Sequence, residues 1–196
     1  MKTIWKLTFM GIAIATLTGL IAVGCGTVRA GYKSAPYAVV RRDGHLELRN
    51  YPALVWVETA MHGSDDSFMR LFRFIGGNNA AKQKIAMTTP VYMAGESTNA
   101  TMAFVLPKNM SAGEAPKPSD PGVTVREIPG GPFAVLRFGG GRNVKNETAA
   151  LAKLNSWLTQ EKIKAVGGPI YGYFDPPWTP TFFRRNEVML RLAPAN

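Results

Sequence analysis

Apolar and polar residues alternate along most of the chain after position 37, with a period of two residues. Residues 45–49 and 54–61 show this alternation, and both stretches are rich in Leu, Val, Trp or Thr. A two-residue period is typical of strands that bury one face. The same pattern predicts further strands at 39–42, 85–93, 101–106, 123–128, 133–138, 170–174 and 187–192.

Two amphipathic helices interrupt the predicted strands. The first covers about eleven residues before Gly76-Gly77, and the second runs from about Val144 to Glu161. Apolar residues at helical spacing place one face of each helix on the core. On the first helix this face consists of Phe68, Leu71, Phe72 and Ile75, and on the second it includes Leu151, Leu154 and Leu158.

The order of predicted elements occurs twice. Residues 48–52 (LRNYP) match residues 125–129 (VREIP), and each copy opens a β-β-α-β-β unit. We therefore predict an α+β fold in which two pseudo-symmetric halves form a twisted antiparallel β-barrel with flanking helices. The seam between the halves is a natural place for a ligand.

The N-terminus has the order of a secretory signal. Lys2 and Lys6 precede an uncharged apolar run over 7–23, which ends at Gly24 and Cys25. Cleavage before an acylated Cys25 would give a lipoprotein anchored to the bacterial envelope and facing the periplasm. Cleavage after residues 28–30 would give a soluble periplasmic protein, and an uncleaved membrane anchor is the third alternative.

These features divide the chain into three parts. We expect a signal peptide over 1–24, a lipidated N-terminus with a flexible tether over 25–36, and one folded domain over 37–194. Cys25 is the only cysteine of the chain. No disulfide can therefore form within the domain, so packing alone must stabilise it.

The net charge of +10 bears on the partners of the protein. Removal of Lys2 and Lys6 with the signal peptide lowers the charge to about +8, which still favours anionic partners. The basic residues are scattered, so we expect no nucleic-acid binding. The sequence has no G-x-S-x-G, H-E-x-x-H or P-loop motif and no prominent pair of carboxylates. We therefore expect a binding protein rather than an enzyme.

Several motifs resemble those of the SOUL (haem-binding protein) family. They occur in the family's order between residues 37 and 193: RNYP at 49–52, GGN at 76–78, KIAMTTPV at 84–91, GYFDPP at 172–177 and RRNEV at 184–188. The resemblance implies a barrel of two pseudo-symmetric halves. It also implies that the protein binds haem or a related tetrapyrrole without catalysing a reaction.

The resemblance also implies a site beside the first helix. By position, Phe68 and Phe72 provide the apolar contacts and Arg73 meets a propionate, a chemistry that suits a flat apolar plate with two carboxylates. The loop over 178–183, with Trp178 and Phe182, is the opposite wall. The sequence departs from the family at Asp65, where the family has a basic residue. A structural role in the core is the alternative for Phe68 and Phe72.

The sequence also departs from the family at the position of an axial ligand of the haem iron. One branch of the family has a histidine where this chain has Asn50, and an amide is not a competent ligand for haem iron. His62, between a strand and the first helix, is the candidate axial ligand, whereas His45 follows a predicted turn and should be solvated. Met69 and Met87 are conceivable thioether ligands, although core packing is the simpler role. We expect no other metal site.

These observations predict an exported, membrane-tethered protein that binds haem or a related tetrapyrrole non-covalently in a surface groove. Two alternatives stay open. The groove could bind another amphipathic anion, or the protein could be a lipoprotein that interacts with other envelope proteins. Similarity of fold does not distinguish between these functions.

Overall fold

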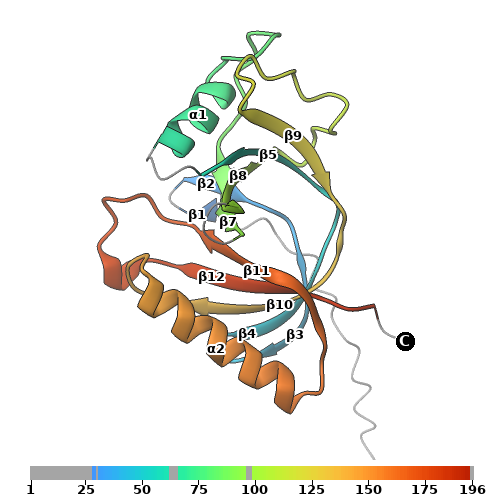
Figure 1. Ribbon diagram of the computed structural model, residues 1–196, viewed down its shortest axis with the longest axis vertical. Coiled ribbons are helices and arrows are strands. Elements are labelled where there is room, and N and C mark those ends of the chain that lie inside the picture. Colours follow the sequence, from blue (N-terminus) through green and yellow to red (C-terminus); the bar gives the residue numbers. More distant parts are fainter. Residues whose placement is uncertain (1–27, 30, 62–65, 96–98, 195–196) are drawn as a thin grey trace, which may run out of the picture.

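A nine-stranded antiparallel sheet and two helices form the fold in the computed structural model (Figure 1). The structure describes residues 28–29, 31–61, 66–95 and 99–194. The strands are β1 Val28–Arg29, β2 Tyr32–Ser34, β3 Ala38–Asp43, β4 Leu46–Tyr51, β5 Leu54–Ala60, β6 Thr88–Thr89, β7 Val91–Ala94, β8 Thr101–Val105, β9 Val123–Ile128, β10 Gly131–Phe138, β11 Ala165–Tyr173 and β12 Asn186–Leu192. The helices are α1 Asp66–Ile75, α2 Val144–Gln160 and the short 3₁₀ helix η2 Thr181–Phe183.

The strand order confirms the predicted duplication. The nine strands lie in the order β3-β4-β10-β12-β11-β7-β8-β5-β9. Eight of these strands form two matching sets: β4, β10, β12 and β11 correspond to β9, β5, β8 and β7, so their order reads the same from either end. The edge strand β3 has no counterpart in the order. The register agrees, because Arg49 lies opposite Phe133 in one half and Arg126 lies opposite Trp56 in the other. A pseudo-twofold axis therefore passes between β7 and β11, which pair across the seam.

The α+β class is confirmed, but the predicted closure into a barrel is wrong. Within the described residues, the edge strands β3 and β9 each pair with one neighbour and not with each other. Large side chains, including Trp56, Tyr92 and Phe133, fill the inner face between the two halves. The sheet is therefore curved around this core and open at both edges.

Each helix covers the outer face of one half (Figure 1). Helix α2 packs on β10, β12 and β11 through buried Leu154, Trp157 and Leu158. The side chain of Asn143 caps its N-terminus by accepting a hydrogen bond from the backbone N–H of Asn146 at 2.9 Å. Helix α1 packs on β5 and β8 in the other half.

Helix α1 differs from its predicted packing. Leu71 and Ile75 are buried as expected, and the third large buried residue of the helix is Phe74. Phe68 and Phe72 keep 37% and 46% of their surface exposed. The buried face of α1 is therefore rotated about the helix axis relative to the predicted face, and the rings of Phe68 and Phe72 lie on the surface.

Two other segments also differ from the sequence-based prediction. The strand expected over 85–93 is reduced to β6 and β7, which Pro90 separates, because proline has no N–H to donate to a ladder. Residues 32–36, expected in a flexible tether, include β2, which pairs with β6, and the buried Ala35. No helix in the described part of the chain is long and apolar enough to cross a membrane.

Candidate functional site

The outer face of the sheet is only partly covered at the seam. Helix α1 lies over β5 and β8, and helix α2 lies mainly over β10 and β12 and also contacts β11, so β7 and part of β11 lie between the two helices. The side chains of Val91, Met93, Tyr171 and Tyr173 on these two strands are half-buried. The seam is therefore a shallow strip of apolar and aromatic side chains between two helices.

Helix α1 presents an aromatic pair at one side of this strip. The rings of Phe68 and Phe72 stack nearly parallel, with centroids 6.0 Å apart and 15° between their planes. Phe68 also meets Phe104 of β8 edge-on at 5.2 Å. The exposed Met69 adds a thioether next to the pair. Exposed aromatic pairs of this kind offer a flat apolar contact surface to a ligand.

Arg73 is the basic side chain of the predicted site. Its Nη2 donates to Asp66 Oδ1 at 2.9 Å, and its Nε donates to the carbonyl of Met69 at 3.3 Å. Both side chains of this ion pair are more than half exposed. A ligand carboxylate could bind Arg73 only in competition with Asp66.

The loop over 174–185 begins where β11 ends and carries the other predicted residues. Trp178 and Phe182 expose 82% and 75% of their surface. At the base of the loop, the hydroxyl of Tyr173 donates to Glu147 of α2 at 2.6 Å. Burial and this hydrogen bond raise the pKa of Tyr173 well above its ordinary value, so the side chain remains a phenol.

The strand register relates the α1 pair to this loop. Phe104, which Phe68 contacts, lies opposite Val91, and Val91 lies opposite Tyr173 at the start of the loop. Two strand spacings span about 10 Å. Within the described residues, no ring contact joins the α1 pair to Trp178 or Phe182. The two predicted walls of the site, the α1 pair and the loop, therefore lie on opposite sides of the seam and do not contact each other.

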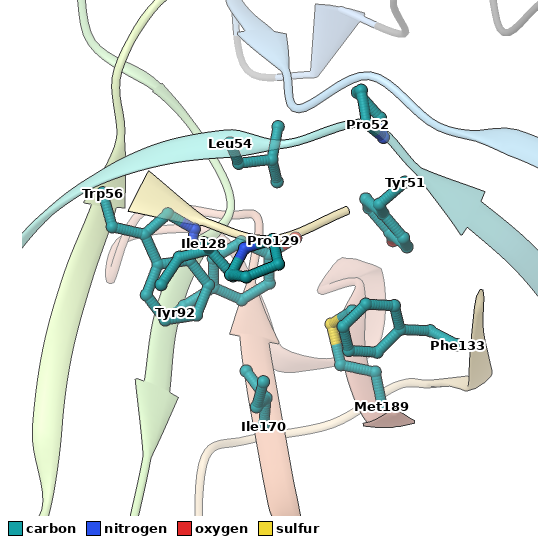
Figure 2. A pocket seen from close by; sticks show the side chains of 10 residues that line it. All are labelled: Tyr51, Pro52, Leu54, Trp56, Tyr92, Ile128, Pro129, Phe133, Ile170 and Met189. Atoms are coloured by element: carbon teal, nitrogen blue, oxygen red, sulfur yellow. The ribbon is translucent and has the colours of Figure 1, made fainter. Parts of the chain in front are cut away.

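A small enclosed cavity lies elsewhere, on the inner face (Figure 2). Its lining includes residues that correspond under the pseudo-twofold: Tyr51 and Ile128, Pro52 and Pro129, Trp56 and Phe133, and Tyr92 and Ile170. Its volume is about 20 Å³, room for one water molecule. Ligand pockets usually exceed about 300 Å³, so this cavity cannot hold a tetrapyrrole.

A buried ionic cluster flanks this cavity, and the sequence analysis missed it. Arg49 donates to Glu187 through both terminal nitrogens, at 2.7 and 2.9 Å, and through Nε to Glu47 at 2.6 Å. Arg185 also pairs with Glu187, at 2.6 Å. Arg49, Glu47 and Glu187 are almost completely buried. Arg49 lies in the RNYP motif and Glu187 in the RRNEV motif, which was the only signal in the sequence, and Glu47 lies outside both motifs.

Several predicted residues have no place in the described site. Cys25, His62 and Asp65 lie outside the described residues. His45 and Asn50 are exposed, and Met87 is half-buried against the core beneath α1. Within the described part of the chain, no group of three or more His, Cys, Asp or Glu side chains could hold a metal ion.

Comparison with known proteins decides the family. The family described as SOUL heme-binding protein matches residues 32–191. The chain belongs to this family. A relative, Heme-binding protein 1 of Xenopus tropicalis, is 28% identical over 161 residues, which cover 75% of this chain and 84% of the relative.

Solved structures share the fold of this SOUL protein at low sequence identity. A hydrolase from Listeria innocua is 9% identical, with a TM-score of 0.61 over 79% of this chain and 94% of that chain. The C-terminal domain of EcmrR is 12% identical, with a TM-score of 0.56 over 76% of this chain and 96% of that chain. At these identities the likeness shows the fold alone.

Proposed function

We propose that this SOUL protein binds haem or a related tetrapyrrole non-covalently on the surface formed by α1 and the seam. The proposal depends most on one observation: a member of a haem-binding family exposes the stacked pair Phe68 and Phe72. If the two rings were buried, they would be ordinary core residues. Two rings that remain 37% and 46% exposed are costly in water unless they have a partner.

The chemistry of the surface suits a flat apolar ring system with two carboxylates. Phe68 and Phe72 provide the apolar face, and Arg73 can pair with a propionate. In this proposal, Trp178 and Phe182 approach from the loop on the other side of the seam, and His62 is the candidate axial ligand. No side chain is assigned a catalytic step, so we propose a binding role.

A hemin titration followed at the Soret band tests this proposal. We expect saturable one-to-one binding to the wild-type protein and at least tenfold weaker binding to Phe72→Asp, because a charge replaces an apolar contact. Val40→Asp is the matched control, since Val40 is an exposed apolar residue on β3, far from α1 in the strand order. Equal affinities of Phe72→Asp and the wild type would overturn the assignment of the site.

We also propose that the protein is exported and tethered to the envelope through an acylated Cys25, with its domain facing the periplasm. The sequence supports this through the order of charge, apolar run and single cysteine at the N-terminus. Metabolic labelling with palmitate tests it: label should appear in the wild type and disappear in Cys25→Ser. An unlabelled wild type would contradict the tether and leave the soluble periplasmic alternative.

A further inference from the structure

One surface patch combines the three most exposed large apolar side chains of the described chain with a fourth, Phe183. Trp178, Phe182 and Phe183 expose 82%, 75% and 65% of their surface, and Val144 at the start of α2 exposes 77%. The backbone N–H of Gly140 donates to the carbonyl of Thr181 at 3.2 Å, which holds the segment just before α2 against η2. We call these four residues the tip patch.

The loop that carries the tip patch is held in place by its own hydrogen bonds. Arg184 donates through Nε to the carbonyl of Thr179 at 2.7 Å and through Nη2 to the carbonyl of Pro177. At the base, the backbone N–H of Arg185 donates to Asp175 at 2.7 Å. Three prolines at 176, 177 and 180 further restrict the backbone. The aromatic rings are therefore displayed on a preorganised loop, which lowers the entropic cost of binding a partner.

The tip patch has cations at its rim. Arg142 and Lys145 lie on either side of Val144 in sequence, and both are exposed. Two carboxylates also lie nearby: Glu147 accepts a hydrogen bond from the hydroxyl of Tyr173, and Asp175 accepts one from the backbone N–H of Arg185. Arg142, Lys145 and Arg184 outnumber these two carboxylates, so the charge at this end of the molecule is positive on balance. Aromatic rings bordered by Lys and Arg are typical of surfaces that enter the interface of a bilayer.

The N-terminal segment runs past the base of the same loop. Arg185 donates to the hydroxyl of Tyr37 at 3.4 Å, and β2 pairs with β6 immediately before the seam strand β7. Strand β1 pairs with β2 and begins at Val28, three residues after Cys25. Three residues span at most about 11 Å. A lipid on Cys25 would thus keep this end of the domain close to the bilayer.

We propose that the tip patch inserts into the headgroup layer of an anionic bilayer, with Trp178 and Phe182 as the inserting side chains. The orientation of the domain depends on the proposed acylation of Cys25, whereas the exposure and the charge of the tip patch are independent of it. Burial of the rings in the interface removes apolar surface from water, and Arg142 and Lys145 bind anionic headgroups. The insertion holds the domain in one orientation on the membrane.

Binding to phospholipid vesicles tests this proposal without the lipid anchor. The protein starts at position 25 and carries Cys25→Ser, because residues 1–24 precede every described element. We expect co-sedimentation with vesicles that contain phosphatidylglycerol, and a blue shift of the tryptophan emission. The other described tryptophans, Trp56 and Trp157, are buried, so Trp178 dominates the change. Binding should weaken as the salt concentration rises from about 0.05 to about 0.5 M.

Trp178 and Phe182 belong to both proposals, whereas Phe72 belongs to the haem surface alone, so the Phe72 variant distinguishes the two. Trp178→Ser with Phe182→Ser should weaken vesicle binding at least about tenfold. Phe72→Ser, which removes an exposed ring on α1, should leave vesicle binding unchanged while it weakens hemin binding. Circular dichroism checks that each variant is folded. If the double variant binds phosphatidylglycerol vesicles as tightly as the wild type, or if the wild type does not bind, the proposal is wrong, whatever the hemin titration and the palmitate labelling show.

Discussion

Arg49 and Glu187 form a two-pronged ion pair across strand β10, which lies between their own strands β4 and β12. Both side chains are almost completely buried. The corresponding position in the other half is Arg126, which pairs with Glu58 at the surface at 2.9 Å. The duplication has thus kept an arginine at equivalent places in two very different environments.

The two arginines should differ strongly in their contribution to stability. Arg49→Met removes the two-pronged partner of the buried carboxylate of Glu187, which keeps Arg185, and one of three arginine partners of Glu47. We therefore expect a loss of about 3–5 kcal/mol in the free energy of unfolding. Arg126→Met removes a single pair whose arginine is more than half exposed, and it should cost about 1 kcal/mol or less. Urea denaturation of both variants measures the difference. Equal losses would show that the buried pair has no special structural role.

The Arg49→Met variant should also respond differently to acid. Burial alone would raise the pKa of Glu187, but the hydrogen bonds and charges of Arg49 and Arg185 outweigh it and hold that pKa below its ordinary value. In the wild type, this contribution to stability is complete above the unfolded pKa of about 4.3 and is lost as the pH falls through the lower folded pKa. Without Arg49 the folded pKa rises, and protonation then relieves the buried charge.

The stability deficit of Arg49→Met relative to the wild type should therefore be largest near neutral pH and smaller at about pH 4. Denaturation curves of both proteins across this range are the measurement. A deficit that stays constant with pH would contradict the proposed coupling between Arg49 and the ionisation of Glu187.

Asp66 competes with any ligand carboxylate for Arg73. Asp66→Asn removes the negative charge 2.9 Å from Arg73, so hemin should bind about two- to fivefold more tightly. Arg73→Glu should weaken binding. Parallel hemin titrations measure both effects, and weaker binding to Asp66→Asn would show that Arg73 does not contact a propionate.

The proposed site depends on the porphyrin face more than on the iron. Iron-free protoporphyrin IX should therefore bind within about fivefold of hemin, as followed by fluorescence quenching. A hemin affinity about a hundredfold higher would instead reveal a strong axial ligand. In that case, the same comparison on His62→Ala would tell whether His62 supplies it.

Periodic patterns predicted the elements well where one face is plainly buried. Helix α2 and strands β5, β8 and β9 lie within one residue of their expected bounds, because their apolar spacing is unambiguous. The repeat of LRNYP and VREIP predicted a pseudo-symmetry that the strand order confirms. Barrel closure could not be predicted, since it depends on how large side chains fill the inner face.

The candidate site was harder to predict than the fold. The spacing of Phe68, Leu71, Phe72 and Ile75 marks one helix face but does not tell which part of that face the sheet covers. The structure buries Phe74 and leaves Phe68 and Phe72 exposed. The Arg49–Glu187 pair joins residues far apart in sequence, and its partners become visible only when β4, β10 and β12 lie side by side.

Hydrogen–deuterium exchange with and without one equivalent of hemin tests the central claim most directly. We expect hemin to slow exchange in α1, residues 66–75, and to leave α2, residues 144–160, unchanged as an internal control. Protection of another segment with no change in α1, or no protection anywhere under conditions where the Soret band reports binding, would contradict a haem site on Phe68 and Phe72.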